Sequence, residues 1–283
     1  MEEIMGIMNR VIGSGITFEP TDQETQQKLM AEDYNKIPGK LHEEDGYNCS
    51  VCLNKGDIWK AFEYRPGWWN HCSTECKCME VRRTIHRMKK SGLKDVIRDY
   101  TFDKYEATAE WQRVLKSAAM EYSKHPDGWF FIGGQSGCGK THLCTAICRE
   151  FLLIGQRVVY MLWRDDVAKI KSLALEAEER EGMFDRFKKA DVLYIDDLFK
   201  MGNAPDGGKQ RPTSADINVA FEIINYRYNN HLATLVSSEW SEDELLDIDE
   251  ATGGRIFERA GANGFSIAPD RSRNYRTRKS VKL

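Results

Sequence analysis

From residue 129 onward, short apolar runs alternate with longer segments whose apolar side chains recur every three or four residues. Short runs bounded by polar or turn-forming residues are typical of strands that are buried on both faces. The four runs occupy residues 129–132, 158–162, 192–195 and 233–237. The segments between them, of which 142–153 is the clearest, have the spacing of helices. Strands that alternate with helices predict an α/β fold, in which helices flank a parallel sheet.

The pattern is weaker outside these runs. Residues 1–12 place apolar side chains on one face of a short helix, which could pack on its own domain or dock on a partner. Residues 13–48 are polar and acidic and are predicted to be weakly structured. The polar helical region after the second strand is expected to break at Gly182, and residues 199–213 are expected to form a loop. A short fifth strand is predicted at 265–267.

A phosphate-binding loop of the form G-x-x-x-x-G-K-T lies between the first of these strands and the helix after it. Its residues are Gly134, Gln135, Ser136, Gly137, Cys138, Gly139, Lys140 and Thr141, and His142 follows them. The glycines allow successive backbone N–H groups to point at phosphate oxygens, and the helix N-terminus adds a positive dipole. We expect Lys140 to reach the β- and γ-phosphates and Thr141 to ligate Mg²⁺. The loop therefore predicts a nucleotide site.

Two aspartates, Asp196 and Asp197, follow the third strand. Because ligands bind at the carboxyl ends of parallel strands, we expect both beside the phosphate loop. Asp196 would support Mg²⁺, usually through water, and Asp197 stands where many ATPases carry the glutamate that orients the attacking water. Since aspartate is shorter than glutamate, slow hydrolysis is expected. A helix cap is the other interpretation of paired acids at the end of a strand.

Five of the eight cysteines lie between residues 49 and 78. This crowding favours a metal site in a reducing cytosol over disulfides. The Cys49-x-x-Cys52 turn is half of a tetrahedral zinc site. The candidates for the other half are His71, Cys72, Cys76 and Cys78. We choose Cys76 and Cys78, with Cys72 as the substitute, and inert or redox-active cysteines are the alternative.

Composition and charge narrow the class of protein further. The chain has 283 residues, of which 41% are hydrophobic and 30% charged, as in soluble globular proteins. No apolar run approaches the roughly 20 residues that span a bilayer, and the acidic start is unlike a signal peptide, so we expect a cytoplasmic protein. The net charge of −3 combines an acidic stretch at 1–48 with basic stretches at 79–98 and 271–283. The basic stretches suit either phosphate backbones or solvent.

Taken in order, the motifs resemble one family. The ordered set occupies residues 134–141, 192–197, 225–228, 234–238, 255–259 and 274–276. It is similar to the AAA+ ATPases of the DnaC/DnaI group, the loaders of bacterial replicative helicases, in the variety often carried by phages. The cysteine pattern and Thr101-Phe102-Asp103 resemble those phage loaders as well. The resemblance covers about residues 47–277.

Charge and the resemblance together predict three segments: an acidic arm with a short amphipathic helix (1–46), a zinc-binding and helicase-contacting module (47–93) and an AAA+ P-loop ATPase domain (94–283). It implies an ATP-dependent loader that binds the hexameric replicative DNA helicase and helps place it on single-stranded DNA in replication initiation. The loader would assemble as a homo-oligomer on the helicase and would use ATP/ADP, Mg²⁺ and Zn²⁺. One alternative is a catalytically weak ATP-binding phage protein that captures a host helicase or loader. The other is a transposition helper ATPase, which usually lacks the cysteine module.

Three arginines acquire roles from the resemblance. Arg259 matches an arginine finger, which reaches the nucleotide of a neighbouring subunit, and Arg255 is the second choice. Arg276 resembles a second sensor that contacts phosphate in its own chain. A planar guanidinium suits phosphate oxygens, although a surface ion pair is the other interpretation of each arginine.

Two further positions follow from the resemblance. Ser238 and Glu239 occupy the end of the fourth strand, where the sensor residue of the family is commonly asparagine. Glu239 departs from that pattern, which affects sensing of the γ-phosphate. Lys169 and Lys171 map onto helices that form the channel for single-stranded DNA in this group, where they would contact backbone phosphates.

Overall fold

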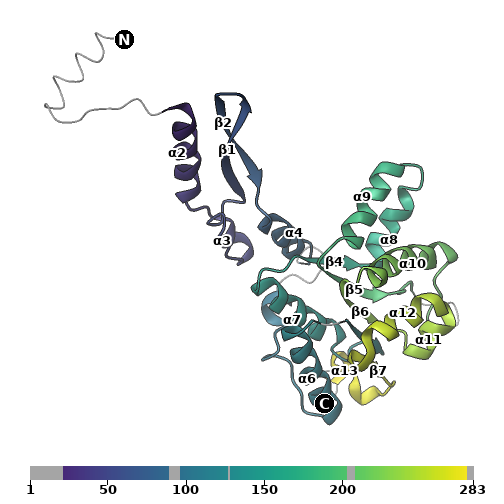
Figure 1. Cartoon of the computed structure of the whole chain (residues 1–283). Coiled ribbons are helices and arrows are strands. Elements are labelled where there is room, and N and C mark those ends of the chain that lie inside the picture. Colours follow the sequence, from purple (N-terminus) through teal and green to yellow (C-terminus); the bar gives the residue numbers. More distant parts are fainter. Residues whose placement is uncertain (1–21, 89–95, 127, 203–207, 279–283) are drawn as a thin grey trace, which may run out of the picture. The chain divides into compact units, whose positions relative to one another are not determined.

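An antiparallel hairpin and a parallel sheet organise the chain, one in each of two units. The structure, a computed structural model, describes residues 22–88, 96–126, 128–202 and 208–278. The chain separates into the units Met1–Cys76 and Lys77–Leu283 (Figure 1). The helix predicted at 1–12 lies outside the described residues, and the domain bounds at 46 and 93 stay predictions.

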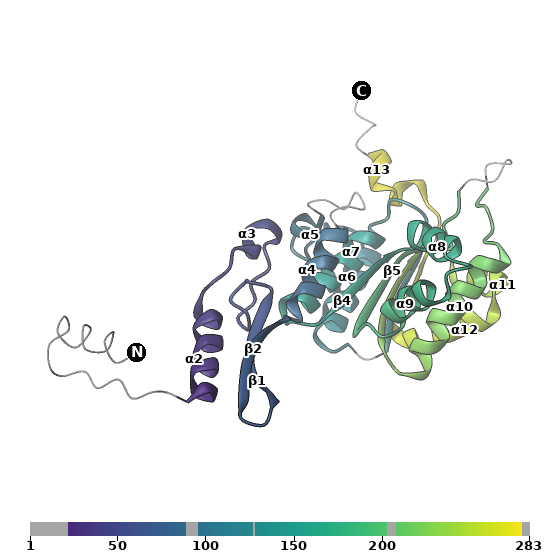
Figure 2. The ribbon, with the colours of Figure 1, turned by 90° about the horizontal axis from the view of Figure 1, so that it is seen from above.

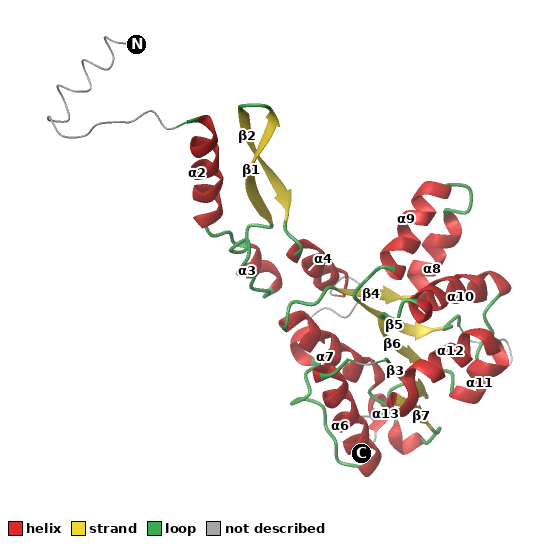
Figure 3. Cartoon of the chain, viewed as in Figure 1, coloured by secondary structure: helices red, strands yellow, loops and turns green. Residues whose placement is uncertain are grey.

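The first unit contains a hairpin with a helix alongside it. Strand β1 (Asp57–Arg65) pairs antiparallel with β2 (Trp68–Glu75). Helix α2 (Gln23–Lys36) packs against both strands, and the short helix α3 (Leu41–Asp45) follows it in the chain (Figure 3). The acidic N-terminal region is therefore tied to the segment that carries the cysteines.

The prediction that residues 13–48 are weakly structured is wrong for these two helices. Helix α2 begins after an N-cap residue, Asp22, whose carboxylate accepts a hydrogen bond from a backbone N–H of the first turn at 2.6 Å. The Asn35 side chain accepts from the N–H of Trp59 at 2.9 Å and donates to its carbonyl oxygen at 2.8 Å. Ala31 is the buried residue of α2, so hydrophobic periodicity gave little signal for a helix that polar contacts hold in place.

The second unit is built on a parallel sheet, of which the described residues form five strands. In order of pairing, these are β4 (Val158–Leu162), β5 (Val192–Leu198), β6 (Ala233–Ser238), β3 (Trp129–Gly134) and β7 (Gly264–Ile267). All neighbours are parallel, which confirms the predicted fold class and the predicted strands. The strand that leads into the phosphate loop lies inside the sheet, so the loop has a strand end on either side.

Helices cover both faces of this sheet (Figure 2). One face carries α6 (Glu110–Lys124) and α7 (Lys140–Leu153), and the other carries α8 (Trp163–Ser172), α9 (Ala177–Lys188), α10 (Ser214–Asn229) and α12 (Glu250–Ala260). The remaining helices are α4 (Cys78–Met88), α5 (Val96–Asp99), α11 (Glu242–Ile248) and α13 (Tyr275–Arg278). Because side chains alternate along a strand, Leu193 and Ile195 of β5 enter the core on the α8–α10 face. Tyr194 and Asp196 therefore point to the face that carries α7.

Two local predictions about helices differ from the structure. The helical region after β4 breaks at 173–176, whereas Gly182 lies inside α9 with open space around it. A glycine in a solvated helix costs about 1 kcal/mol, which the rest of α9 tolerates. The basic residues of 81–93 predict a helix over that segment. The helix, α4, begins earlier, at Cys78, and is described as far as Met88. The described part of 199–213 is a loop, as predicted.

Arg227 of α10 is fully buried and joins the sheet to α9. Its guanidinium donates to the Thr234 hydroxyl at 2.9 Å and to the carbonyl oxygens of Phe187, Lys188, Ala190 and Ala233. Two of these carbonyls end α9, where helix carbonyls have no partner within the helix and positive charge is favoured. Burial lowers the pKa of Arg227 to about 9, so the group keeps its charge at neutral pH.

Replacing Arg227 with lysine should destabilise the second unit by about 2–4 kcal/mol, because an ammonium cannot reach all these acceptors and leaves buried carbonyls unpaired. Urea denaturation followed by circular dichroism measures the free energy of unfolding. The control is Arg180→Lys on α9, whose side chain is 42% exposed and which should change that energy by less than about 0.5 kcal/mol. Equal stability of Arg227→Lys and the parent would contradict this role.

Candidate functional site

The loop between β3 and α7 has the backbone shape that phosphate binding requires. Gly137 and Gly139 have φ values of 78° and 94°, which glycine adopts without strain. A Cβ atom on Gly137 would lie 2.1 Å from Oδ1 of Asn274, so this point has no room for a side chain. Gly139 is the N-cap residue of α7, and the first N–H groups of that helix have no acceptor within it. The loop thus presents backbone donors suited to an anion.

Lys140 and Thr141 begin α7 and stand at this loop. Lys140 is buried, and its Nζ donates to the carbonyl oxygens of Gly134 at 2.7 Å and of Gln135 at 2.8 Å. The ammonium is therefore folded back over the loop, where phosphate oxygens would meet it. Thr141 Oγ1 donates toward Oδ1 of Asp196 at 3.4 Å. The structure thus brings the two predicted residues of the loop and the first predicted aspartate together.

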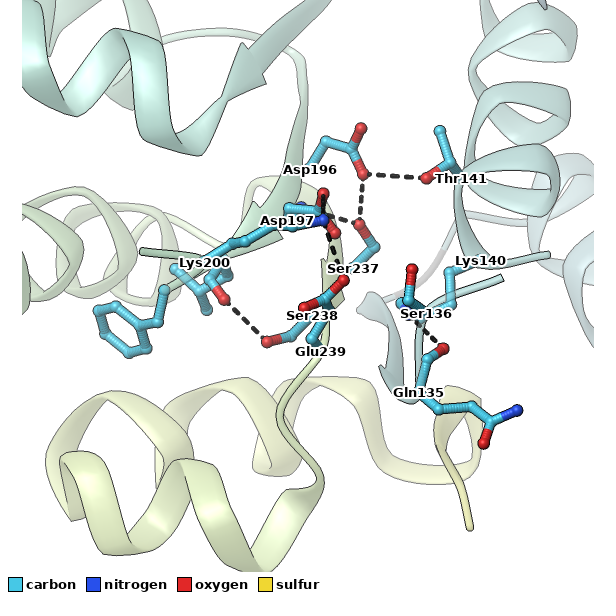
Figure 4. Close-up of polar contacts among 12 residues, drawn as sticks. Gln135, Ser136, Lys140, Thr141, Asp196, Asp197, Lys200, Ser237, Ser238 and Glu239 are labelled. Carbon is cyan, nitrogen blue, oxygen red and sulfur yellow. Dashed lines mark hydrogen bonds and ion pairs between the residues drawn. The ribbon is translucent and has the colours of Figure 1, made fainter. Parts of the chain in front are cut away.

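Asp196 is buried in β5, and hydroxyl groups surround its carboxylate. Oδ1 accepts hydrogen bonds from Ser237 at 2.6 Å and from Thr141 (Figure 4). Oδ1 also accepts one from Tyr194 at 2.6 Å. Oδ2 accepts from Tyr160 at 2.9 Å. Carboxylate and hydroxyl oxygens suit Mg²⁺, which usually keeps several of its waters. Because both oxygens of Asp196 already accept hydrogen bonds, the residues fit Mg²⁺ held directly by Thr141 and through water by Asp196.

Asp197 is paired with a lysine that the sequence analysis missed. Its Oδ2 lies 2.8 Å from Nζ of Lys200, and the same Nζ lies 2.9 Å from Oε1 of Glu239 (Figure 4). The N–H of Asp197 donates to the Ser237 hydroxyl at 3.0 Å. Burial raises the pKa of Asp197 and the charge of Asp196 adds to the effect, while Lys200 opposes both. Asp197 is thus a carboxylate already engaged by a cation.

A cavity of about 470 Å³ lies over the loop. Its lining includes Lys140, Thr141, Asp197, Lys200 and Glu239, and Arg276 from the C-terminal segment. Arg276 Nη1 donates to the Ser136 hydroxyl at 3.3 Å, and the N–H of Tyr275 donates to the Gly137 carbonyl at 2.9 Å. The structure therefore places Arg276 at the phosphate loop of its own chain.

An aromatic wall closes another side of the cavity. The ring of His142 stacks on Tyr100, with centroids 4.4 Å apart and planes 4° from parallel. Nε2 of His142 lies 2.9 Å from the Thr101 carbonyl oxygen. Burial lowers the pKa of His142, which favours the neutral ring. Flat rings beside a phosphate loop suit the base of a nucleotide.

Other predicted residues of the loop shape it without lining the cavity. The Gln135 side chain donates to the carbonyl oxygen of Asp270 and accepts from its N–H, both at 2.7 Å. The buried thiol of Cys138 donates to the Gln135 carbonyl oxygen at 3.0 Å, and burial raises the pKa of that thiol. These contacts hold the loop in shape, and the cysteine is a neutral packing group.

The two arginines of α12 lie apart from the residues that line this cavity in the described chain. Arg255 donates to Asn225 at 3.0 Å and to the Ala251 carbonyl at 2.7 Å, so its guanidinium is engaged within the chain. Arg259 has a buried Nε without a hydrogen-bond partner among the described residues. A role for Arg259 in the nucleotide site of a neighbouring subunit stays a prediction.

The two lysines expected at single-stranded DNA differ in their surroundings. Nζ of Lys171 lies 2.9 Å from Oδ1 of Asp216, a carboxylate that is buried at the start of α10. Lys169 is exposed. Contact of Lys171 with DNA would require breaking this ion pair, so Lys169 is the better placed of the two.

Sequence reasoning missed Lys200 and three of the four hydroxyls around Asp196, those of Tyr194, Ser237 and Tyr160. Tyr194 had a signal, because it precedes Asp196 by two positions on the same strand and thus shares its face. Ser237 and Tyr160 come from the strands on either side of β5. The register that brings them to Asp196 depends on how the strands pair and cannot be inferred from the sequence of one strand.

The four cysteines chosen from the sequence lie together. The Sγ atoms of Cys49, Cys52, Cys76 and Cys78 are buried and within 4.8 Å of one another. The Sγ atoms of Cys49 and Cys76 are 3.9 Å apart, and four sulfurs around a zinc ion would be separated by roughly 3.8 Å. The N–H of Gly56 donates to Sγ of Cys52 at 3.3 Å, a contact that favours a thiolate. These donors fit a tetrahedral zinc site.

The substitute ligands lie outside this cluster. Cys72 is exposed on β2. Nδ1 of His71 contacts the Gln27 side chain, and the His71 ring packs against Trp59 with centroids 5.3 Å apart. His71 therefore fastens α2 to the hairpin.

Comparison with known proteins gives a consistent picture. The family of the bacterial DnaA ATPase domain matches residues 96–256. The chain is 32% identical over 204 residues to the uncharacterized protein YqaM of Bacillus subtilis (strain 168), a match that covers 68% of this chain and 62% of YqaM. The chain thus spans less than two thirds of that relative's length. Among the described helices, none combines the length and apolarity needed to cross a bilayer.

Two further relatives are matched over more of their length. The chain is 31% identical over 221 residues to the phage-like element PBSX protein XkdC of Bacillus subtilis (strain 168), covering 75% of this chain and 79% of XkdC. It is 30% identical over 189 residues to the replicative helicase loader DnaC of Escherichia coli (strain K12), covering 65% and 71%. The fold resembles the crystal structure of the DnaC helicase loader, with a TM-score of 0.50, 20% identity and coverage of 62% and 98%. These matches confirm the resemblance predicted from the motifs.

Replacing Lys140 with alanine should weaken ATP binding at least tenfold, on the order of the loss of one or two charge-assisted hydrogen bonds. Displacement of a fluorescent ATP analogue measures the affinity. Metal content and thermal unfolding of the variant serve as controls and should match the parent. Tight ATP binding by Lys140→Ala would show that the loop does not hold the phosphates.

Zinc content should depend on the buried cysteines. We expect about one zinc per chain in the parent and in Cys72→Ser, and loss of zinc in Cys76→Ser, since a serine hydroxyl is a poor zinc ligand. Inductively coupled plasma mass spectrometry of protein purified without chelators measures the ratio. Equal zinc in the Cys76→Ser and Cys72→Ser proteins would refute the assignment.

Proposed function

The chain belongs to the family of AAA+ ATPases that includes the bacterial DnaA ATPase domain and the DnaC helicase loaders, and from this premise we propose that it loads a replicative DNA helicase. In this proposal it binds the hexameric helicase, helps place it on single-stranded DNA in replication initiation, and assembles on it as a cytoplasmic homo-oligomer. The observation that carries the proposal is the 30% identity to DnaC over 71% of DnaC.

The cavity over the phosphate loop is the proposed ATP site. Lys140 binds the β- and γ-phosphates, and Thr141 and Asp196 hold Mg²⁺, which when bound neutralises phosphate charge. Asp197 orients the water that attacks the γ-phosphate, once it is released from Lys200. The contacts of these residues with one another, and their position around one cavity, support these roles.

Two arginines complete the proposed site. Arg276 contacts a phosphate of the nucleotide that its own chain binds, a role supported by its hydrogen bond to Ser136 in the phosphate loop. Arg259 reaches the nucleotide of a neighbouring protomer, a role supported by its match to the arginine finger of the family. A guanidinium at either place would stabilise charge on the transferred phosphoryl group.

The cysteine cluster is the proposed structural centre of the helicase-contacting module. Zinc held by Cys49, Cys52, Cys76 and Cys78 would fix the ends of the hairpin, since Cys52 and Cys76 flank its two strands. The hairpin exposes Phe62, Tyr64 and Trp68, and exposed aromatic side chains are common in protein interfaces. This supports a surface for the helicase in the first unit.

A second function has one observation in its favour. The ion pair between Asp197 and Lys200 must break before Asp197 can orient water. This supports the alternative of an ATP-binding phage protein that barely hydrolyses ATP and captures a host helicase or loader. The steady-state ATPase rate, with and without single-stranded DNA, separates the two, since a loader should turn over ATP in at least one condition.

Co-purification with a replicative helicase tests the main proposal. The parent should be retained by an immobilised helicase to a different extent in ATP and in ADP. The double variant Cys49→Ser and Cys52→Ser should lose retention because the first unit loses its metal ligands, yet keep ATP affinity within about twofold. Cys72→Ser is the matched control and should be retained. A parent that binds ATP but no helicase would refute the loader.

A further inference from the structure

Three charged side chains meet at the ends of β5 and β6, beside the phosphate loop. Lys200 lies between Asp197 and Glu239, at 2.8 and 2.9 Å. The side chains are 39% exposed for Lys200 and 23% for each carboxylate, and all three line the cavity. One ammonium therefore serves two carboxylates, so this cluster of three side chains carries one more negative charge than positive.

Glu239 reaches from this cluster to the loop itself. Burial alone would raise the pKa of Glu239, but the hydrogen bond and charge of Lys200, the charge of Lys140 and a hydrogen bond from Ser136 lower it. The carboxylate thus lies among the same cations and donors that a phosphate would use. A terminal phosphate bound by Lys140 would meet a like charge at Glu239 unless Glu239 gave way.

The Lys200 side chain can change partner when a terminal phosphate repels Glu239. An ammonium has three donors, of which Asp197 and Glu239 take two. The segment that carries Lys200 is fixed by a turn in which its N–H donates to the Asp197 carbonyl at 2.9 Å. Asp197 and Phe199 have φ values of 57° and 61°, a left-handed conformation that side-chain-bearing residues adopt where surroundings impose it. The backbone is thus held while the long side chain can change partner.

We propose that Lys200 is the γ-phosphate sensor of this site, which exchanges Glu239 for the terminal phosphate of ATP and leaves ADP unsensed. Glu239 accepts hydrogen bonds but cannot donate one to phosphate, so a cation must do the sensing at this wall. The exchange frees the Glu239 side chain to turn away from the phosphate and gives Lys200 a stronger acceptor. It also weakens the hold of Lys200 on Asp197. The inference rests on ATP binding, and not on the helicase as partner.

Affinities for a non-hydrolysable ATP analogue and for ADP, measured by isothermal titration calorimetry, test the sensor. Lys200→Ala should bind the ATP analogue about tenfold more weakly, the loss expected for one charge-assisted hydrogen bond, with ADP affinity within about twofold. Lys200→Arg should restore most of the difference, because it keeps the charge. Glu239→Gln should act in the opposite direction and tighten the analogue, because it removes the repelling charge.

The control is Lys189→Ala, which removes an exposed lysine paired with Asp185 at 2.6 Å and should change neither affinity. If Lys200→Ala lowers both affinities equally, or neither, Lys200 is structural and the inference fails while the ATP site stands. If the parent protein binds neither nucleotide, the ATP site fails and the sensor with it. Thermal unfolding of each variant shows whether a change in affinity comes from a change in folding.

Discussion

A carboxylate removed from water must find donors for its oxygens, and Asp196 takes them from four elements. The hydroxyls come from Tyr160 on β4, from Tyr194 on β5 (the strand of Asp196 itself), from Ser237 on β6 and from Thr141 on α7. Removing one such donor leaves part of a buried charge unpaired, at a cost on the order of 1–3 kcal/mol. The same hydrogen bonds therefore depend on the register of three strands, on the start of α7 and on the placement of the proposed magnesium ligands.

The first unit solves a different problem, because its core is small. Among its described residues, the buried apolar side chains are those of Ala31, Cys49, Cys52 and Cys76. So little apolar burial stabilises a short hairpin and a helix poorly, and small domains usually rely on a metal or disulfides in that case. A metal bound by the cysteines would couple folding of this unit to ligand binding, whereas the second unit rests on its sheet.

Most parts of the fold that the sequence predicted are local ones, and the exceptions are contacts between recognised motifs, such as the cysteine cluster. The strand, loop and helix around Lys140 are contiguous, and their spacing alone fixes the phosphate loop. Helix α2 was not predicted because its contacts, such as that of Asn35 with the hairpin, are polar and join residues distant in sequence. The role of Lys200 was not predicted for a related reason. It lies in a loop without hydrophobic periodicity, and its second partner, Glu239, follows β6, which is distant in sequence. Sites assembled across strands need the register, which only the folded chain supplies.

The contacts around Glu239 extend from the nucleotide site toward α12. The Glu239 carbonyl oxygen accepts from Nζ of Lys209 at 2.9 Å, and this ammonium lies 4.4 Å from the ring centroid of Trp240. Trp240 in turn donates to the carbonyl oxygen of Phe199, the residue before Lys200, at 3.0 Å. The segment of Lys200 and the segment of Glu239 are thus joined twice, once by their charged side chains and once by Trp240. Trp240 comes just before α11 in the chain, and α11 packs on α12. Since α12 carries Arg259, an exchange of partners at Glu239 would act on the helix whose arginine we propose to reach a neighbouring protomer. Coupling between two sites requires an element that has two arrangements. The Lys200 side chain is such an element in our proposal, because it pairs either with Glu239 or with the terminal phosphate.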